Sequence, residues 1–272
     1  MPIISHKKLA VSLSLLLLIA LFFVLYQKGL FRLPSRGTKK TELSLTIPEG
    51  WNTTEIAAYL DQQQITPKTD FNALAGQDAT TTLVQKFSFL KEKPGHTGLE
   101  GYLFPDTYRF YTSTPAAQVA VRMLQNFDAK FSDELRKETE RQHHTIFEII
   151  TMASLIEKEA ATDADRELVS GILWKRLDLG IPLQVDATII FVTGHRTARV
   201  SYADTSIDSP YNTYRYKGLP RGPIANPGIS AISAALYPKK SFYLYYLSTP
   251  DGDTIFSKTL EEHNRAKAKY LK

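Results

Sequence analysis

The spacing of apolar and polar side chains predicts a small mixed unit in the first part of the chain. Residues 43–50 alternate between apolar and polar side chains and end in Pro-Glu-Gly, which indicates a short strand followed by a turn. Two short helical patterns follow, the first after the capping residues 52–54 and the second over residues 69–76. Residues 107–111 then supply a second strand. We therefore expect a strand–helix–helix–strand unit in residues 41–112, with an insertion before its last strand.

Longer patterns predict a mainly helical second part, residues 113–272. Helical spacing occurs in five segments: residues 115–141, 146–161, 165–179, 230–236 and 259–271. The first is expected to break near residues 131–133, and a hairpin is expected around the Pro-Asp-Gly turn at residues 250–252. Residues 206–230 are rich in proline and glycine and predict a long ordered loop, and such loops within a compact domain commonly carry function. The predicted fold class is α+β.

Residues 9–26 form an apolar run of about 18 residues without a charged side chain, the length needed to cross a bilayer. A cleaved signal peptide is the alternative, but the run ends in Phe-Phe-Val-Leu-Tyr-Gln-Lys and has no Ala-x-Ala-like site. We therefore expect residues 1–40 to comprise a short cytoplasmic tail, an uncleaved transmembrane helix and a linker. More lysine and arginine side chains follow the run than precede it, and their count alone would place the main domain in the cytoplasm. Because a long domain can be translocated despite its charge, the orientation stays open.

Composition excludes several classes of chemistry. The chain of 272 residues has no cysteine, which rules out disulfides, zinc thiolates, iron–sulfur clusters and thiol nucleophiles. Its net charge of +5 is scattered and forms no stripe for a nucleic-acid backbone, although a mildly basic surface suits an anionic membrane or cell-wall polymer. The sequence has no HExxH, GxSxG or phosphate-binding loop, and His143-His144 lacks a third metal ligand. We predict no metal, no cofactor and no nucleic-acid partner.

Two carboxylates at the end of the helix predicted for residues 146–161 are the main candidates for chemistry. A helical wheel places Glu157 and Glu159 on opposite edges of the apolar face, with Glu157 slightly the more buried. Burial against apolar walls raises the pKa of a carboxyl group, so a protonated glutamate there can act as a general acid. The alternative is structural, since either glutamate can pair with a nearby cation such as Arg166 or Arg176.

Aromatic and amide side chains in the long loop are candidates for sugar recognition. Tyr211, Asn212 and Tyr214 lie close together in its sequence. Aromatic rings stack on the faces of pyranose sugars, and amides form hydrogen bonds with their hydroxyls. Packing in the core explains the same residues equally well.

Four motifs together resemble the endolytic murein transglycosylase family (MltG, also called YceG-like). They are LEGYLFPDTYRF at residues 99–110, ASLIEKEA at 153–160, DRELVSGILWKRLDLGIPLQVDATIIF at 165–191 and SPYNTYRYKGLPRGPIANPG at 209–228. Their order and spacing are similar to those of the family, as is the single N-terminal anchor. The resemblance implies a LysM-like subdomain in residues 41–112 and a larger mixed α/β catalytic domain in residues 113–272.

The activity that this resemblance implies is that of a lytic transglycosylase. Such an enzyme cleaves the β-1,4 bond between N-acetylmuramic acid and N-acetylglucosamine inside nascent peptidoglycan strands. It uses no water, leaves a 1,6-anhydro-muramyl end and terminates strand elongation. The resemblance also implies a single-pass protein of the cytoplasmic membrane with its catalytic domain on the extracytoplasmic side, against the charge count. Peptidoglycan strands are the expected substrate, and peptidoglycan synthases (penicillin-binding proteins) are candidate partners.

The resemblance also assigns roles to individual residues. The family's catalytic acid is the second glutamate of its Glu-Lys-Glu motif, which corresponds to Glu159, while the wheel keeps Glu157 as the fallback. Further positions in the four motifs are expected by analogy to bind substrate: Glu100, Glu157, Gln184, Asp186, Asn212 and Tyr214. Two other functions stay open. One is a glycan-binding scaffold without turnover, and the other is a hydrolysing muramidase in which Asp186 supplies a second carboxylate about 5 to 9 Å from Glu159.

Overall fold

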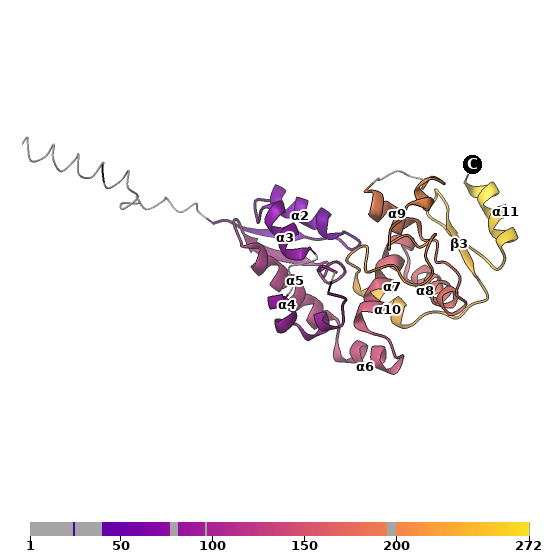
Figure 1. The fold of residues 1–272 in the computed structure, drawn as a ribbon, viewed down its shortest axis with the longest axis horizontal. Helices are drawn as coiled ribbons and strands as arrows, with labels where there is room; N and C mark the ends of the chain where they lie inside the picture. Colours follow the sequence, from indigo (N-terminus) through magenta and orange to yellow (C-terminus); the bar gives the residue numbers. More distant parts are fainter. Residues whose placement is uncertain (1–23, 25–39, 77–80, 96, 195–199, 272) are drawn as a thin grey trace, which may run out of the picture. The chain divides into compact units, whose positions relative to one another are not determined.

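The computed structural model describes residues 40–76, 81–95, 97–194 and 200–271 (Figure 1). Before residue 40 it describes only Val24. The chain divides into two compact units, Met1–Lys40 and Thr41–Lys272, and every contact reported below lies within the second. The predicted anchor, residues 9–26, lies outside the described residues except for Val24. None of the helices that the structure describes is long and apolar enough to cross a membrane.

The first part of the second unit has the order of elements that the sequence predicts. Strand β1 (Glu42–Thr46) pairs antiparallel with β2 (Thr107–Tyr111). Between them lie α2 (Thr53–Gln62), which begins with a capping box, and α3 (Lys68–Ala75). The strand–helix–helix–strand arrangement is therefore confirmed, and its LysM-like identity stays a prediction.

The insertion before β2 contains two short helices that the sequence pattern does not predict, α4 (Thr81–Lys86) and the 3-10 helix η1 (Ser88–Lys91). Phe89 of η1 packs between two aromatic rings, with centroids 5.8 Å from Tyr102 and 4.8 Å from Phe127. All three rings are buried, so the insertion contributes to the common core rather than lying on its surface.

Six helices of the second part agree with the predicted segments: α5 (Ala116–Lys130), α6 (Asp133–Arg141), α7 (Ile146–Glu159), α8 (Asp163–Asp178), α10 (Ile229–Leu236) and α11 (Leu260–Tyr270). The predicted break lies between α5 and α6. Ser132 marks it, because its side chain caps α6 by accepting the Leu135 N–H.

Helix α7 is the buried centre of this part, and α8 and α10 pack against it (Figure 1). A capping box between Thr145 and Glu148 fixes its first turn. Residues 149–156 are all buried, and each fully buried isoleucine or leucine among them stabilises the fold by about 1.5–3 kcal/mol. The last turn of α7, which carries Glu157 and Glu159, therefore directly follows a buried and well-packed part of the helix.

Helix α9 (Asp186–Thr193) is absent from the sequence prediction. Its Thr, Ile and Val residues favour strands, but three of its residues are buried and Gly194 ends it in the left-handed conformation. The predicted hairpin is confirmed as β3 (Tyr245–Ser248) and β4 (Thr254–Ser257), which pair antiparallel. Residues 207–228 form the predicted loop, without helix or strand.

Candidate active site

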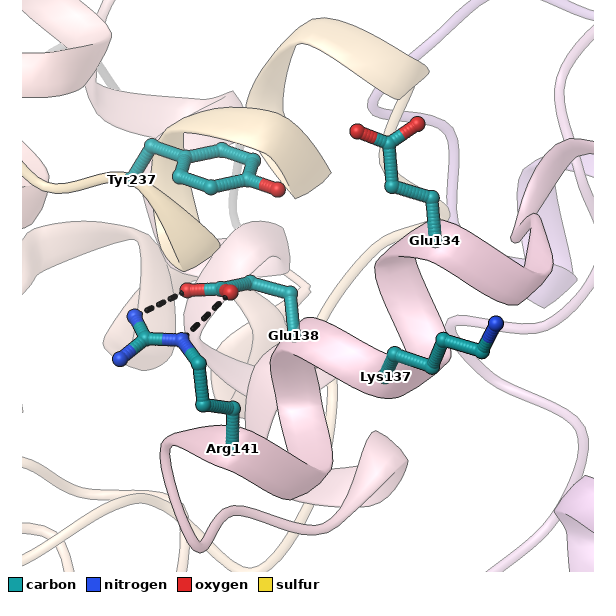
Figure 2. Close-up of a pocket in the computed structure, with 5 residues that line it drawn as sticks. All are labelled: Glu134, Lys137, Glu138, Arg141 and Tyr237. Atoms are coloured by element: carbon teal, nitrogen blue, oxygen red, sulfur yellow. Dashed lines mark hydrogen bonds and ion pairs between the residues drawn. The ribbon is translucent and has the colours of Figure 1, made fainter.

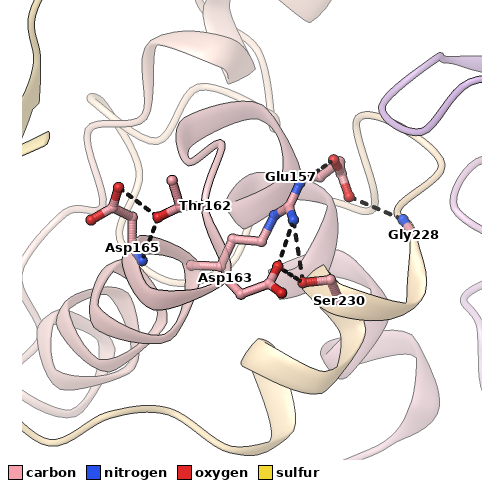
Figure 3. A network of polar contacts seen from close by, with 7 residues as sticks. Glu157, Thr162, Asp163, Asp165, Gly228 and Ser230 are labelled. Atoms are coloured by element: carbon pink, nitrogen blue, oxygen red, sulfur yellow. Dashed lines mark hydrogen bonds and ion pairs between the residues drawn. The ribbon is translucent and has the colours of Figure 1, made fainter. Parts of the chain in front are cut away.

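The last turn of α7 directs its two glutamates to different neighbours. Glu157 Oε1 lies 3.2 Å from Arg166 Nη2, and its Oε2 accepts the Gly228 N–H at 3.0 Å (Figure 3). Both charged side chains are largely buried, with 6% of Glu157 and 13% of Arg166 exposed. Burial raises the pKa of Glu157, and the Gly228 N–H and the Arg166 charge oppose that rise.

Arg166 extends this contact into a network at the starts of α8 and α10 (Figure 3). Its Nη1 donates to Asp163 Oδ1 at 3.0 Å and to Ser230 Oγ at 3.2 Å, and Ser230 in turn donates to Asp163. Breaking a buried ion pair is costly because it leaves an uncompensated charge. Glu157 therefore has the ion-pair partner that the structural alternative expects and joins three helices, and its contact with substrate stays a prediction.

Glu159 is partly buried and faces the start of α9. Its carboxyl group lies near the Tyr246 hydroxyl of β3 and the Ala187 N–H in the first turn of α9. Burial raises the pKa of Glu159 to about 7, and the charge of Asp186 adds to this rise, while the two nearby donor groups oppose it. At neutral pH the carboxyl group is therefore present in both forms, as a group that acts first as an acid and then as a base requires.

Asp186 and Tyr214 complete this cluster. Asp186, the first residue of α9, is exposed, and the Tyr214 hydroxyl donates a hydrogen bond to its Oδ1. Burial raises the pKa of the Tyr214 phenol, and the charges of Asp186 and Glu159 contribute to the rise. Three of the predicted site residues thus converge from α7, α9 and the long loop.

Gln184 lies at the bend that leads into α9. Its backbone is in the left-handed region, with φ 55°, and its Oε1 accepts a hydrogen bond from Arg176 Nη2 at 2.7 Å. The loop fixes this bend through Thr213, whose carbonyl accepts the Gln184 N–H at 3.0 Å and whose hydroxyl accepts the Val185 N–H at 3.0 Å. The bend sets the direction in which α9 begins, and hence the position of Asp186.

Asn212 shapes the loop from within. It is 1% exposed, and its Nδ2 donates to the carbonyls of Thr205 at 3.0 Å and Ile207 at 2.7 Å. Its Oδ1 accepts the Tyr214 N–H at 2.9 Å. Because its amide is fully engaged, Asn212 holds the loop in place, and its contact with substrate stays a prediction.

Glu100 links the first part of the unit to the loop. Its oxygens accept the Thr53 N–H at the start of α2, at 3.2 and 2.9 Å, and its Oε1 accepts a hydrogen bond from Asn226 Nδ2 at 2.9 Å. Burial raises the pKa of Glu100 to about 7, against the effect of the Thr53 hydrogen bonds. Asn226 is completely buried, donates to the Trp51 carbonyl at 3.0 Å and accepts the Leu103 N–H at 2.9 Å.

The predicted site residues therefore separate into two groups. Glu159, Asp186 and Tyr214 lie together, with Gln184 at the adjacent bend. Glu100, Glu157 and Asn212 are instead engaged in hydrogen bonds and ion pairs that hold the framework. Sequence reasoning missed Tyr246 and the Ala187 N–H, and it considered Arg176 only as an ion-pair partner of a glutamate, whereas Arg176 donates to Gln184 and Pro182. Tyr246 stands in a strand that is rich in aromatic residues, so no local signal distinguishes it.

Two surface hollows lie away from the Glu159 cluster. One, of about 360 Å³, is lined by residues of α6 and by Tyr237, and in it Arg141 donates twice to Glu138, at 2.8 and 2.6 Å (Figure 2). The other, of about 250 Å³, lies beside η1 and α6. Neither is lined by Glu159 or Asp186, so we do not place chemistry there. Within the described part of the chain, no group of three or more His, Asp or Glu is placed to hold a metal ion.

Known proteins resemble the chain over most of its length. An endolytic murein transglycosylase of Bacillus subtilis is 37% identical over 237 residues, which is 84% of this chain and 65% of that protein. A protein of the same name from Streptococcus pneumoniae serotype 2 is 34% identical over 246 residues, which is 84% of this chain and 44% of that protein. The chain thus spans less than two thirds of the length of these relatives.

A solved structure and a family model agree with these relatives. The crystal structure of a yceG-like protein from Listeria monocytogenes matches with a TM-score of 0.74 at 36% identity, over 83% of this chain and 75% of that chain. The model of the YceG-like family matches residues 27–269, which include the Glu159 cluster and all four motifs. The resemblance drawn from the motifs is confirmed, and the chain belongs to the YceG-like family.

Proposed function

We propose that this chain is an endolytic lytic transglycosylase of peptidoglycan. It cleaves the β-1,4 bond between N-acetylmuramic acid and N-acetylglucosamine within a strand and leaves a 1,6-anhydro-muramyl end. The observation that carries the proposal is Glu159, a partly buried carboxyl group whose pKa of about 7 lets it hold or release a proton at neutral pH. The names of the Bacillus and Streptococcus relatives support the assignment.

The reaction needs one carboxyl group acting twice. Protonated Glu159 donates its proton to the glycosidic oxygen as the bond from that oxygen to C1 of the muramyl sugar breaks. The resulting carboxylate then accepts the proton of the C6 hydroxyl of the same sugar while the C6 oxygen forms a bond to C1. No water is consumed, and the internal nucleophile gains from proximity. Glu159 ends protonated and ready for the next cycle.

Asp186 is the residue on which a hydrolytic alternative depends. A muramidase would use a second carboxylate to activate water or to form a covalent intermediate. Asp186 is exposed but accepts a hydrogen bond from Tyr214, and its charge contributes to the raised pKa of Glu159. These contacts favour a role in keeping Glu159 protonated, so hydrolysis is the second candidate. A scaffold that binds glycan without turnover would not need a carboxyl group whose pKa is raised to about 7.

The cellular setting belongs to the same proposal. An anchor at residues 9–26 would hold the enzyme to the cytoplasmic membrane by a single span, with Glu159 on the extracytoplasmic side, where nascent strands are made. A LysM-like unit formed by residues 41–112 would bind the strand. Peptidoglycan synthases (penicillin-binding proteins) would then be its neighbours. A reporter fused to the C-terminus tests the topology, since a cytoplasmic signal contradicts it.

Mass spectrometry of the cleavage products tests the chemistry. Uncrosslinked glycan strands incubated with the protein should yield internal fragments that end in anhydro-muramyl residues. Products heavier by one water, with reducing ends, would instead identify a muramidase. Glu159→Gln should abolish cleavage without unfolding the protein. Glu148→Gln is the matched control, because glutamine at this position of α7 preserves the capping box, and it should cleave at the normal rate.

A further inference from the structure

The turn between β1 and α2, residues 47–52, lies against the last turn of α7. Lys158 Nζ donates to the Gly50 carbonyl at 3.3 Å, and a Cβ at Gly50 would lie 3.5 Å from Glu157 Cγ. The same turn pairs with the end of the long loop, where the Gly50 N–H donates to the Asn226 carbonyl at 2.9 Å. The first part of the unit therefore reaches the helix end that carries the candidate acid.

The backbone of Trp51 is fixed within this turn. Its carbonyl accepts the Asn226 N–H at 2.9 Å and a second hydrogen bond from Asn226 Nδ2 at 3.0 Å. The next residue, Asn52, caps α2 through a capping box. Because the chain is held on both sides of Trp51, little of its freedom remains to be lost when a ligand binds.

The indole ring of Trp51 has the features of a binding surface. It is half-buried and pairs edge-to-face with Tyr59 of α2, with ring centroids 5.4 Å apart and planes at 81°, so Tyr59 covers at most one face of the indole. Within the described part of the chain, the Trp51 N–H and the Tyr59 hydroxyl have no hydrogen-bond partner, and both atoms reach the surface. The indole of Trp174, by contrast, donates to the Ala235 carbonyl at 2.9 Å, as a packing tryptophan commonly does.

We propose that Trp51, with Tyr59 beside it, binds a sugar of the glycan strand at a subsite away from the bond that is cleaved. The inference rests on the proposed function and names a residue that selects its substrate. A fixed aromatic ring stacks on the face of a pyranose, and the adjacent N–H and O–H groups can bond its hydroxyls.

The position of the turn makes this subsite remote from the acid. Gly50 contacts the side of the α7 end that carries Glu157 and Lys158, whereas Glu159 faces the start of α9. A strand that is cut internally continues past the cleaved bond in both directions, so its more distant sugars remain available for binding. Binding energy from such remote units is lost with short substrates. Trp51 therefore favours long strands.

Kinetics of the full-length protein in detergent test the subsite. The measurement compares kcat/KM for long uncrosslinked strands with kcat/KM for the shortest strand that the protein cleaves. Trp51→Leu keeps an apolar side chain and removes the ring, while Trp51→Phe keeps a smaller ring. Tyr237→Leu is the matched control, because Tyr237 is also a surface aromatic residue, 47% exposed, and lines the hollow beside α6 away from the Glu159 cluster.

We expect Trp51→Leu to lower kcat/KM for long strands by about five- to tenfold, through a higher KM at a nearly unchanged kcat. Trp51→Phe should lose less, because it can still stack. On the shortest strand, the loss in Trp51→Leu should stay below about twofold. Tyr237→Leu should match the wild type on both substrates.

A second measurement follows binding without cleavage, in Glu159→Gln labelled with fluorotryptophan. The chain has two tryptophans, so its ¹⁹F NMR spectrum has two signals, which Trp51→Phe assigns. Saturating long strands should shift the Trp51 signal and leave the Trp174 signal in place. The measured protein keeps Trp51, so this result decides the question even if Trp51→Leu does not fold.

An unshifted Trp51 signal in the presence of saturating long strands overturns the inference. Equal losses on long and short strands overturn it as well, and so does an equal loss in Tyr237→Leu. Failure of the proposed function looks different. In that case Glu159→Gln still cleaves, or the wild type forms no anhydro-muramyl ends, while long strands still shift the Trp51 signal.

Discussion

Replacing Asn226 by alanine is expected to destabilise the fold severely, because this side chain joins three segments of the chain. Its Nδ2 donates to the Trp51 carbonyl at 3.0 Å and to Glu100 Oε1 at 2.9 Å. Its Oδ1 accepts the Leu103 N–H at 2.9 Å. The position is completely buried, so water does not replace the lost partners at the protein surface.

The expected magnitude follows from what each partner retains. A buried polar group left without a partner costs about 1–3 kcal/mol. The Trp51 carbonyl still accepts the backbone N–H of position 226 at 2.9 Å, and Glu100 still accepts the Thr53 N–H. The Leu103 N–H loses the acceptor that it has in the structure. We therefore expect a loss of about 3–4 kcal/mol, of which about 1–3 kcal/mol comes from the unpaired Leu103 N–H and the rest from the two weakened acceptors.

Urea unfolding of a chain spanning residues 41–272 measures this loss, with the fluorescence of Trp51 and Trp174 as the signal. The matched control is Asn126→Ala, which removes a partly buried amide with two hydrogen bonds and should cost about 1 kcal/mol. If Asn226→Ala costs no more than this control at an unchanged m value, the reasoning from the buried network is refuted.

Four further measurements test the site and its framework. Asp186→Asn should lower the pKa of Glu159, and the descending limb of kcat/KM should move to lower pH; a move to higher pH would contradict the assigned sign. Because the folded-state pKa of Glu159, about 7, exceeds its ordinary value of 4.5, stability should fall as pH rises through this interval. Thermal melts of Glu159→Gln should lack that loss, so the stability of the variant should rise relative to that of the wild type between pH 4.5 and about 7. Glu157→Ala should cost about 3 kcal/mol in urea unfolding, since its buried arginine partner is left unpaired; a loss under about 1 kcal/mol would contradict this. Gly101→Ala should lower the melting temperature far more than Gly180→Ala, because a Cβ at Gly101 would lie 2.6 Å from a proline side chain, whereas Gly180 faces open space.

The fold was predictable from sequence where a segment's own pattern decides its structure. The strand at residues 42–46 alternates, α7 combines a capping box with a long apolar face, and the break at Ser132 follows a capping signal. Helix α9 was not predictable in this way. Its β-branched residues favour a strand, and the bend before its first turn is held by hydrogen bonds to Thr213, which is distant in sequence.

The candidate site was predictable only in part, for a related reason. The wheel places Glu157 and Glu159 at the edges of a buried face but gives no information on what lies opposite each edge. Arg166 faces Glu157 and gives that residue an ion-pair partner, whatever burial the wheel predicts for it. The Tyr246 hydroxyl and the start of α9 face Glu159, and these neighbours depend on tertiary contacts held by Arg176.

The spacing of the two glutamates has a consequence for transplanting this acid to another scaffold. Residues two apart on a helix differ in direction by about 200°, and here each meets the beginning of a different helix. Glu157 accepts the N–H of Gly228, which caps α10, while Glu159 lies near the N–H of Ala187 in the first turn of α9. The last turn of α7 is thus a junction at which two positive helix ends meet two carboxylates. A graft that carried Glu159 alone would lose the helix ends that surround its carboxyl group here. The smallest transplantable form of the acid is therefore the whole three-helix junction.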